Sequence, residues 1–381
     1  MTVAAESELY AAMLLSRVGY YHLQEVQQLY HAAGSARAVV AAASDIRQLV
    51  PDASPRLVEL LARLPEYQKR VDSELEYIQQ HPAVHALLPS DGDYPQRLRH
   101  CVDAPLVLYA LGEARLNARR VVSVVGTRRC TRYGQDLIRA FISRLRALCP
   151  EALVVSGLAY GVDVCAHREC LQSQLPTVGV LAHGLDDLYP RPHRETARQM
   201  VEQGGALLTE FMTHTPADKV NFVRRNRIVA GMSDAVVLVE SAAKGGGLIT
   251  CGIARDYSRD VFAFPGPVGA PYSEGCNQLI RDNGAALITT ADDLVAAMGW
   301  QTDQALSRAK RQGIERQLFP ELSADEQRVV DVLRKQNDLQ QNDLCVRTGI
   351  AIGPLTALLF TLEMKGLVRA YAGGSYHLVG D

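Results

Sequence analysis

The sequence lacks any long apolar segment. Its apolar stretches, for example those at 121–126 and 235–239, are far shorter than the roughly 20 residues that a membrane-spanning helix needs. The first residues, MTVAAESELYAAMLL, include glutamates where a secretion signal would be basic. We therefore expect a cytoplasmic protein that does not associate with a membrane.

The eight cysteines are scattered, and none forms a CxxC pair. The closest two, Cys165 and Cys170, lack the short, repeated spacing of a zinc site or a disulfide framework. Nucleotide motifs are missing as well, because Gly126 and Gly134 do not give GxGxxG and no GxxxxGKS or GxxxxGKT occurs. These absences predict reduced thiols, no metal site and no cofactor.

An excess of charge of one sign is also missing. Lysine and arginine number 40 and aspartate and glutamate 42, which gives a net charge of −2. The field of the whole molecule cannot attract nucleic acid, so any such binding requires a local basic surface. With 48% hydrophobic residues in 381, the composition is that of a globular protein of two or three domains.

Different kinds of segment follow one another along the chain. Residues 1–80 repeat apolar side chains at helical spacing between turn signals, which predicts a small helical domain. Several prolines and Asp91–Gly92 mark residues 81–118 as an irregular connector. Residues 301–322 are polar and weakly periodic, as in a linker, and a C-terminal domain is expected at 323–381.

The central part, 119–300, alternates short runs rich in valine, leucine and alanine with helix-length segments. Near-continuous apolar strands separated by helices predict a parallel sheet that is covered on both faces. We therefore expect an α/β fold with an extended Rossmann-like doubly wound sheet. The expected strands are Arg120–Val125, Ala152–Val155, Thr177–Leu181, Ala206–Thr209, Ala235–Glu240, Asp260–Phe264 and Ala285–Thr289.

The C-terminal domain is predicted to be a winged helix. Ser323 and Glu326 have capping-box spacing before the first of three helix-length segments, and Gly373–Gly374 suits a hairpin turn between two strand-like stretches. The third helix carries only Glu363 and Lys365 as charges, whereas a DNA recognition helix has several Arg, Lys, Asn or Gln residues. We expect this domain to contact protein, or to tune DNA binding indirectly.

The segments that follow the strands are informative because ligands of a doubly wound sheet lie outside the carboxyl ends of its strands. Arg128 follows the first strand, Arg191 follows the third, and 217–231 carries one lysine and three arginines against a single aspartate. Guanidinium groups suit phosphate, and Phe222 offers a stacking face for a base. This pattern favours a single-stranded DNA site, although ion pairs or a solvated helix face would also explain the arginine run.

Catalysis has little support in the sequence. Asp163 and His167 would share a helix face, but a first-turn carboxylate beside a core histidine explains them better than an acid–base pair. Glu240, at a strand end, is the best acid–base candidate and has no evident partner. Ser156 does not lie in a GxSxG motif. We therefore expect no enzymatic activity.

Several different motifs follow one another between Tyr94 and Ala285. They include Gly126-Thr-Arg128, Ser156-Gly-Leu-Ala-Tyr-Gly-Val-Asp163, Arg225-Asn-Arg227, Gly246-Gly-Leu-Ile-Thr250 and Phe264-Pro-Gly266. In order and spacing, and together with the three-part layout, they resemble the DNA-processing protein A family (DprA, also called Smf). The N-terminal residues are loosely similar to the helical module of that family, of SAM or helix-hairpin-helix type.

The resemblance implies a protein that binds incoming single-stranded DNA during natural transformation, protects it and helps to load the RecA recombinase. It also implies a homodimer that forms through the Rossmann-like domain. The positions that match the DNA pocket of the family are Arg128, Arg191, Phe222, Arg225, Asn226, Arg227, Gly245, Gly246, Gly247 and Thr250.

The sequence departs from the family pattern at four positions. Val223 stands where proline is usual, and His193 replaces an asparagine. Gly245 and Gly247 stand where many members have serines, which keeps backbone donors but removes two hydroxyl groups.

A nucleotide-processing Rossmann enzyme, such as a nucleoside-monophosphate phosphoribohydrolase, is the alternative interpretation. Residues Lys244–Thr250 resemble the glycine-rich strand end of such enzymes. Their signature, however, places Pro-Gly-Gly before Gly-Thr and a glutamate shortly after, whereas here no acid follows Thr250 until Asp256.

Overall fold

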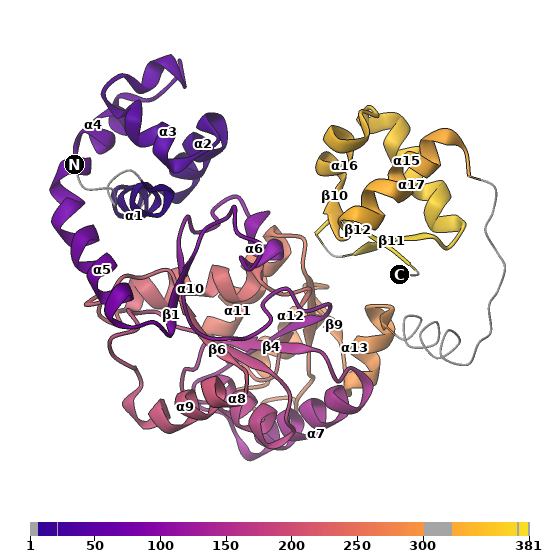
Figure 1. Cartoon of the computed structure of the whole chain (residues 1–381). Helices are drawn as coiled ribbons and strands as arrows, with labels where there is room; N and C mark the ends of the chain where they lie inside the picture. The colour runs from indigo at the N-terminus through magenta and orange to yellow at the C-terminus, as the bar shows by residue number, and fades with distance from the viewer. Residues whose placement is uncertain (1–6, 21, 301–321, 372, 380–381) are drawn as a thin grey trace.

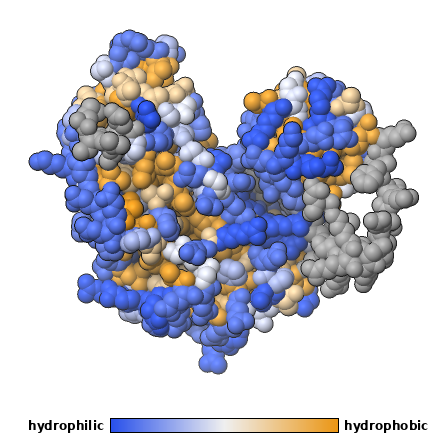
Figure 2. Space-filling view, in the orientation of Figure 1, coloured by the Kyte–Doolittle hydropathy of each residue, from blue (hydrophilic) through white to orange (hydrophobic). Residues whose placement is uncertain are grey.

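The computed structural model describes residues 7–20, 22–300, 322–371 and 373–379. These residues form N-terminal helices, a central α/β part and a C-terminal winged helix, and both outer parts lie on the same side of the central sheet (Figure 1). Figure 2 shows a hollow between the two outer parts, with hydrophilic residues along its winged-helix side. The linker expected at 301–322 lies outside the described residues except for Leu322.

The N-terminal part is helical, as expected. Serine side chains define where several helices begin, because Ser7, Ser35 and Ser54 each accept a hydrogen bond from a backbone N–H in the first turn. The core of this part continues into the central sheet through Tyr109 and Met212. The elements are α1 (Glu8–Val18), α2 (Leu23–Ala33), α3 (Ala36–Ala41), η2 (Ala43–Gln48), α4 (Pro55–Ala62), η3 (Leu64–Tyr67) and α5 (Gln68–Gln80).

The central sheet has nine strands in the order β1-β2-β6-β5-β4-β3-β7-β8-β9. The seven strands from β3 to β9 are parallel and correspond to the seven that the apolar runs predict. The strand order reverses between β3 and β7, which is where a doubly wound sheet leaves a crevice for a ligand. These strands are β3 (Val121–Val125), β4 (Leu153–Ser156), β5 (Thr177–Val180), β6 (Ala206–Thr209), β7 (Ala235–Leu238), β8 (Asp260–Ala263) and β9 (Ala286–Leu287).

The segment 81–118 is not irregular throughout, contrary to the expectation. It contributes β1 (Val84–Leu87) and β2 (Leu108–Gly112), together with the short helix α6 (Gln96–Arg99). Strand β2 pairs with β6 in antiparallel register, and β1 pairs with β2. The expected connector therefore extends the sheet at one edge.

Helices cover both faces of the sheet. Helices α10 (Lys219–Gly231) and α11 (Gly246–Asp256) pack in one apolar cluster, and α7 (Arg132–Leu148), α8 (Val162–Gln172) and α13 (Ala291–Ala297) pack in another. Two-sided coverage explains why the strands are apolar on both faces. The remaining elements are η4 (Arg191–His193), α9 (Arg194–Glu202) and α12 (Glu274–Arg281).

The C-terminal domain forms three helices and a three-stranded sheet of order β10-β12-β11. The capping box is present, since Ser323 Oγ accepts from Glu326 N at 3.2 Å and Glu326 accepts from Ser323 N at 2.7 Å. Gly373 N donates to Ser258 O of the central part at 3.0 Å. The elements are α15 (Ala324–Lys335), β10 (Leu339–Gln340), α16 (Gln341–Thr348), α17 (Ile352–Met364), β11 (Val368–Tyr371) and β12 (Ser375–Leu378).

Over the described ranges, no single helix has both the length and the apolar composition to cross a membrane. Helices α16 and α17, bent by 108° relative to each other, pass that test only as a pair and only on length and composition.

Candidate nucleic-acid interface

A cavity of about 610 Å³ lies at the point where the strand order reverses. Its walls come from the segments that follow β3 and β4, from α10 and from the N-terminal end of α11. Eight of the ten residues predicted from the sequence line it: Arg128, Phe222, Arg225, Asn226, Gly245, Gly246, Gly247 and Thr250.

Several polar groups of this first cavity are available to a ligand. Arg128, Lys219 and Asn226 line it, and none of their side chains has a hydrogen bond or an ion pair within the part of the chain that the structure describes. The first backbone N–H groups of α11 at Gly246 and Gly247 have no partner inside the helix and carry the positive end of its dipole. Lys219 lies in the basic segment 217–231 and is not one of the pocket residues that the sequence predicts.

Phe222 gives the first cavity an aromatic wall. The guanidinium of Arg128 lies over its ring at 4.7 Å from the centroid, and that of Arg225 lies at 6.0 Å. The ring is half-buried, so one part of it faces the cavity. A guanidinium beside an aromatic ring at a cavity wall can bind a phosphate and its base together.

Arg225 supports the first cavity from below. Its side chain is buried, and Nη1 donates to Gly157 O at 2.5 Å, at the end of β4, and to Val180 O at the end of β5. A Cβ atom at Gly157 would lie 2.0 Å from this Nη1, so only glycine leaves room for the guanidinium. Burial lowers the pKa of Arg225 to about 10, against the opposing effect of Asp163. Arg225 therefore remains cationic at neutral pH and places a positive charge under the cavity floor.

Arg227 does not line the first cavity, contrary to the expectation for the arginine run. Arg224 and Arg227 are three residues apart and share the opposite face of α10. Both donate to Glu210 Oε2, at 2.7 and 2.5 Å, and all three side chains are largely buried. Ion pairing, one of the two alternative explanations of the arginine run, is therefore correct for Arg224 and Arg227. Arg225, in contrast, points to the ends of the strands.

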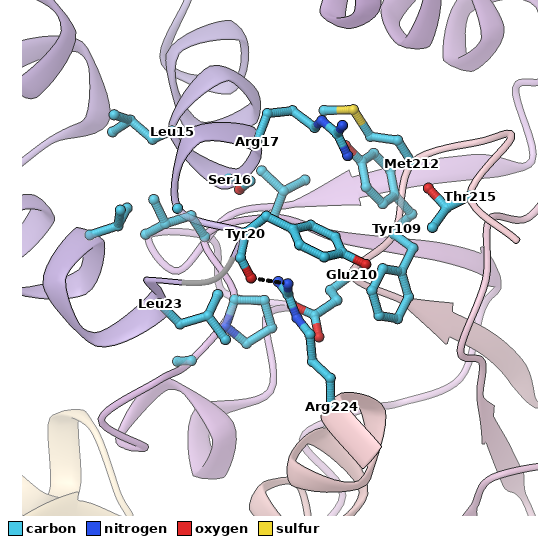
Figure 3. A pocket seen from close by; sticks show the side chains of 17 residues that line it. Leu15, Ser16, Arg17, Tyr20, Leu23, Tyr109, Glu210, Met212, Thr215 and Arg224 are labelled. Carbon is cyan, nitrogen blue, oxygen red and sulfur yellow. Dashed lines mark hydrogen bonds and ion pairs between the residues drawn. The ribbon is translucent and has the colours of Figure 1, made fainter. Parts of the chain in front are cut away.

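The same face of α10 is joined to the N-terminal helices (Figure 3). Arg224 Nη1 donates to Tyr20 O, and its guanidinium lies over the Tyr20 ring at 4.2 Å from the centroid. Tyr20 Oη donates to Asn221 Oδ1. One side of α10 is thus fixed by the N-terminal part, and the other side forms the cavity wall.

Arg191 also does not line the first cavity. It lies exposed on η4, in the segment that follows Tyr189, whose ring is 5.8 Å from that of Phe222. His193 in the same turn is buried and its Nδ1 lies 2.8 Å from Leu158 O. Its position holds the segment after β5 against the segment after β4.

The matches with known proteins agree with this architecture. Residues 85–299 match the family model of DNA recombination-mediator protein A, and residues 315–374 match the DprA winged helix domain. The chain belongs to the DNA recombination-mediator protein A family. It is 34% identical over 322 residues to protein Smf of Escherichia coli, with 82% of each chain covered.

Solved structures of DprA proteins share the fold. The X-ray structure of DNA processing protein A from Streptococcus pneumoniae superposes with a TM-score of 0.63 at 29% identity, covering 76% of this chain and 97% of that one. DNA processing protein A from Helicobacter pylori, described by its single-stranded DNA binding mode, gives a TM-score of 0.51 at 26% identity and covers 57% and 96%.

Two departures of this DprA-family chain have steric reasons. A Cβ at Gly247 would lie 2.7 Å from Leu238 Cδ1 and 3.1 Å from Gly126 Cα, so the glycine lets α11 approach the turn after β3. A Cβ at Gly245 would lie 2.2 Å from Ser241 Oγ. Both glycines leave backbone N–H groups as the donors of this loop.

Glu240, the best acid–base candidate in the sequence, has a structural role in this DprA-family chain. Its carboxylate is buried and accepts from Thr131 N at 2.8 Å and from Thr131 Oγ1 at 2.6 Å. Its backbone oxygen accepts from Thr127 N at 2.7 Å. Glu240 therefore fixes both ends of the turn that carries Arg128.

Asp163 and His167 do not form an acid–base pair. Asp163 lies in the first turn of α8, and burial raises the pKa of its carboxyl. His167 is fully buried, its Nδ1 lies 2.7 Å from Thr177 Oγ1, and burial lowers its pKa to about 3. The interpretation as a first-turn carboxylate and a core histidine is confirmed.

The lowered pKa of His167 predicts a pH dependence of stability. Below its ordinary pKa of 6.5, the unfolded chain binds a proton that the folded chain does not, so the free energy of unfolding falls as the pH falls from 6.5 toward 3. Between pH 7.5 and 5.5 this site contributes a loss of about 1.4 kcal/mol. His193, whose pKa burial also lowers, acts in the same direction.

Urea unfolding at the two pH values measures this loss. His167→Gln is expected to flatten the dependence, whereas His85→Gln, at an exposed histidine, leaves it unchanged. An equal slope in wild type and His167→Gln would contradict the assignment.

Proposed function

We propose that the protein binds single-stranded DNA in the first cavity and, without catalysing a reaction itself, helps to load the RecA recombinase on that strand. The observation that carries the DNA part is the convergence of Arg128, Lys219, Phe222, Asn226 and the N-terminus of α11 on one cavity. Cations and N–H donors suit the backbone phosphates, and an aromatic ring suits any base.

The non-catalytic role is supported by the state of the candidate acids and bases. Glu240 holds a turn, Asp163 lies in a buried helix start beside Arg225, and His167 lies in the core. These three residues therefore do not form a pair of an acid and a base that faces the cavity. A nucleotide-processing enzyme would need one, because base release requires a water to be activated.

The RecA and dimer parts of the proposal rest on the family. The resemblance implies a homodimer through the Rossmann-like domain and a role in transformation and recombination. The winged helix fits a protein contact better than duplex reading, because the exposed face of α17 presents Ile352, Phe360 and Met364. These side chains lack the hydrogen-bonding groups that read base edges.

A mobility-shift assay with one strand and its duplex, at two salt concentrations, tests the DNA part. We expect tighter binding of the single strand for unrelated sequences, with an affinity that falls steeply as salt rises. Equal or tighter binding of the duplex would contradict the proposal. Release of a free base from nucleotides by the purified protein would instead support the phosphoribohydrolase alternative.

A further inference from the structure

A second cavity, of about 690 Å³, lies where the N-terminal helices meet the segment that follows β6. Its lining comes from α1, α4, η3 and α5, from Tyr20 and His22 between α1 and α2, and from residues 213–216. None of the residues singled out in the sequence lies in it. Its charged lining residues are Arg17, Arg56, Glu59, Arg63 and Arg70, with His22 and His214 beside them.

The second cavity is rich in cationic side chains. Four arginines and two histidines line it against one carboxylate, Glu59. Two carboxylates outside the lining pair with these arginines, Glu66 with Arg63 at 3.1 Å and Glu74 with Arg70 at 2.8 Å. The first cavity has Arg128, Lys219 and Arg225 against two carboxylates, Asp163 and Asp218. In a protein with a net charge of −2, such a concentration of arginine in one recess is the kind of local surface that attracts a polyanion.

Two of these arginines have donors without a partner. Nε of Arg17 and Nη1 of Arg70 are buried, and no hydrogen-bond acceptor reaches either atom within the described part of the chain. Nη2 of Arg70 is occupied by Glu74 Oε2 at 2.8 Å and by Thr213. A buried donor without an acceptor is costly, so both guanidinium groups would gain from an additional acceptor close to them.

The cavity also has an aromatic side. The Arg17 guanidinium lies 5.7 Å from the centroids of both Tyr20 and Tyr67. Arg63 lies 5.9 Å from the Tyr67 ring, and Arg56 Nη2 lies 3.0 Å from His22 Nε2. Arginines beside half-buried rings are the same combination that the first cavity uses for a phosphate and its base.

The two cavities are neighbours along one segment of chain. Thr213, His214, Thr215 and Pro216 line the second cavity, and the next residues, 217–219, line the first. Residues 213–219 therefore form part of the lining of both cavities in succession, and a strand that follows this segment would pass from one cavity to the other.

We propose that the second cavity binds the backbone phosphates of single-stranded DNA beyond the nucleotides held in the first cavity, an inference that rests on the proposed function. The first cavity then holds a short piece of the strand, and the arginines of the N-terminal helices extend the contact. The affinity for a long strand exceeds that for a short one by the contribution of these arginines.

The double variant Arg56→Gln/Arg63→Gln tests the inference on the full-length protein. Both side chains are exposed, so their removal does not disturb the core. Each lost phosphate contact reduces the affinity by a factor of about 5 at about 0.1 M salt, so a strand of roughly 25 nucleotides is expected to bind roughly 25-fold more weakly. The slope of log affinity against log salt becomes shallower by about 1.4. A strand of roughly five nucleotides, which fits the first cavity alone, keeps its affinity.

The matched control is Arg198→Gln/Arg328→Gln, which removes two exposed arginines that line neither cavity. It is expected to bind both strands almost as wild type does. Unchanged long-strand affinity and slope in Arg56→Gln/Arg63→Gln, with normal wild-type binding, would refute the second site alone. Absence of any single-strand binding by wild type would refute the proposed function itself.

A free phosphate compound is the other source of the same chemistry. Calorimetry with dATP and with inorganic pyrophosphate distinguishes it from DNA. One outcome would show that the cavity binds a free phosphate compound and that the DNA assignment is wrong. In that outcome, dATP or pyrophosphate binds wild type at micromolar concentration but does not bind Arg56→Gln/Arg63→Gln, and the variant keeps its affinity for the long strand.

Discussion

Replacing Arg128 by glutamate is expected to lower the affinity for a short single strand by roughly 25-fold or more at about 0.1 M salt. Loss of one phosphate contact accounts for a factor of about 5, and repulsion by the new carboxylate for a similar factor. Arg128 also lies over the ring of Phe222, so the substitution removes a group that orients the stacking face. Fluorescence anisotropy with a labelled oligonucleotide measures the change.

Arg129→Glu is the matched control for this prediction. Arg129 is the next residue, is exposed, and does not line the first cavity. Both variants change the net charge equally, so a general electrostatic effect would weaken binding in both alike. An equal loss in the two variants would therefore refute the assignment of Arg128, as would wild-type affinity in Arg128→Glu. Because both side chains are exposed, urea unfolding should show no loss of stability in either.

The parallel strands could be predicted because each is an apolar run between helix-length segments. Strands β1 and β2 could not, because they are short and lie among prolines in 81–118. Strand β2 is stabilised by pairing with β6, nearly a hundred residues away along the chain, as in the register of Tyr109 with Thr209. Pairing between distant segments leaves no local pattern, since strand formation depends on its neighbours.

The position of the first cavity could be predicted, because cations and glycines gather after the strands. The direction of each arginine could not. Helical spacing predicts that Arg224 and Arg227 share one face and that Arg225 lies on another. Which of these faces meets the cavity depends on the position of an acidic residue outside the helix. That acid is Glu210, just after β6, and nothing in its sequence context marks it. The second cavity was missed because its arginines come from separate helices.

Replacing Glu210 by glutamine is expected to lower the free energy of unfolding by about 3–5 kcal/mol. The carboxylate is buried, and its Oε2 accepts from Arg224 at 2.7 Å and from Arg227 at 2.5 Å. The neutral amide would remove the countercharge that the two guanidinium groups share, in a place from which water is largely excluded. Breaking one side of a buried pair costs more than the pair contributes, because the remaining charge stays desolvated. Equilibrium urea unfolding measures the loss.

Two further variants isolate the cause. Glu195→Gln removes a carboxylate that pairs with Arg198 on the exposed surface, and no measurable change is expected because solvent screens that pair. Glu210→Leu combined with Arg224→Leu and Arg227→Met removes the charges together, and this triple variant should regain much of the stability that Glu210→Gln loses. Wild-type stability in Glu210→Gln would show that water reaches the two arginines. A triple variant weaker than Glu210→Gln would show that the arginines stabilise the protein through their hydrogen bonds to Tyr20 and Asp103 rather than through Glu210.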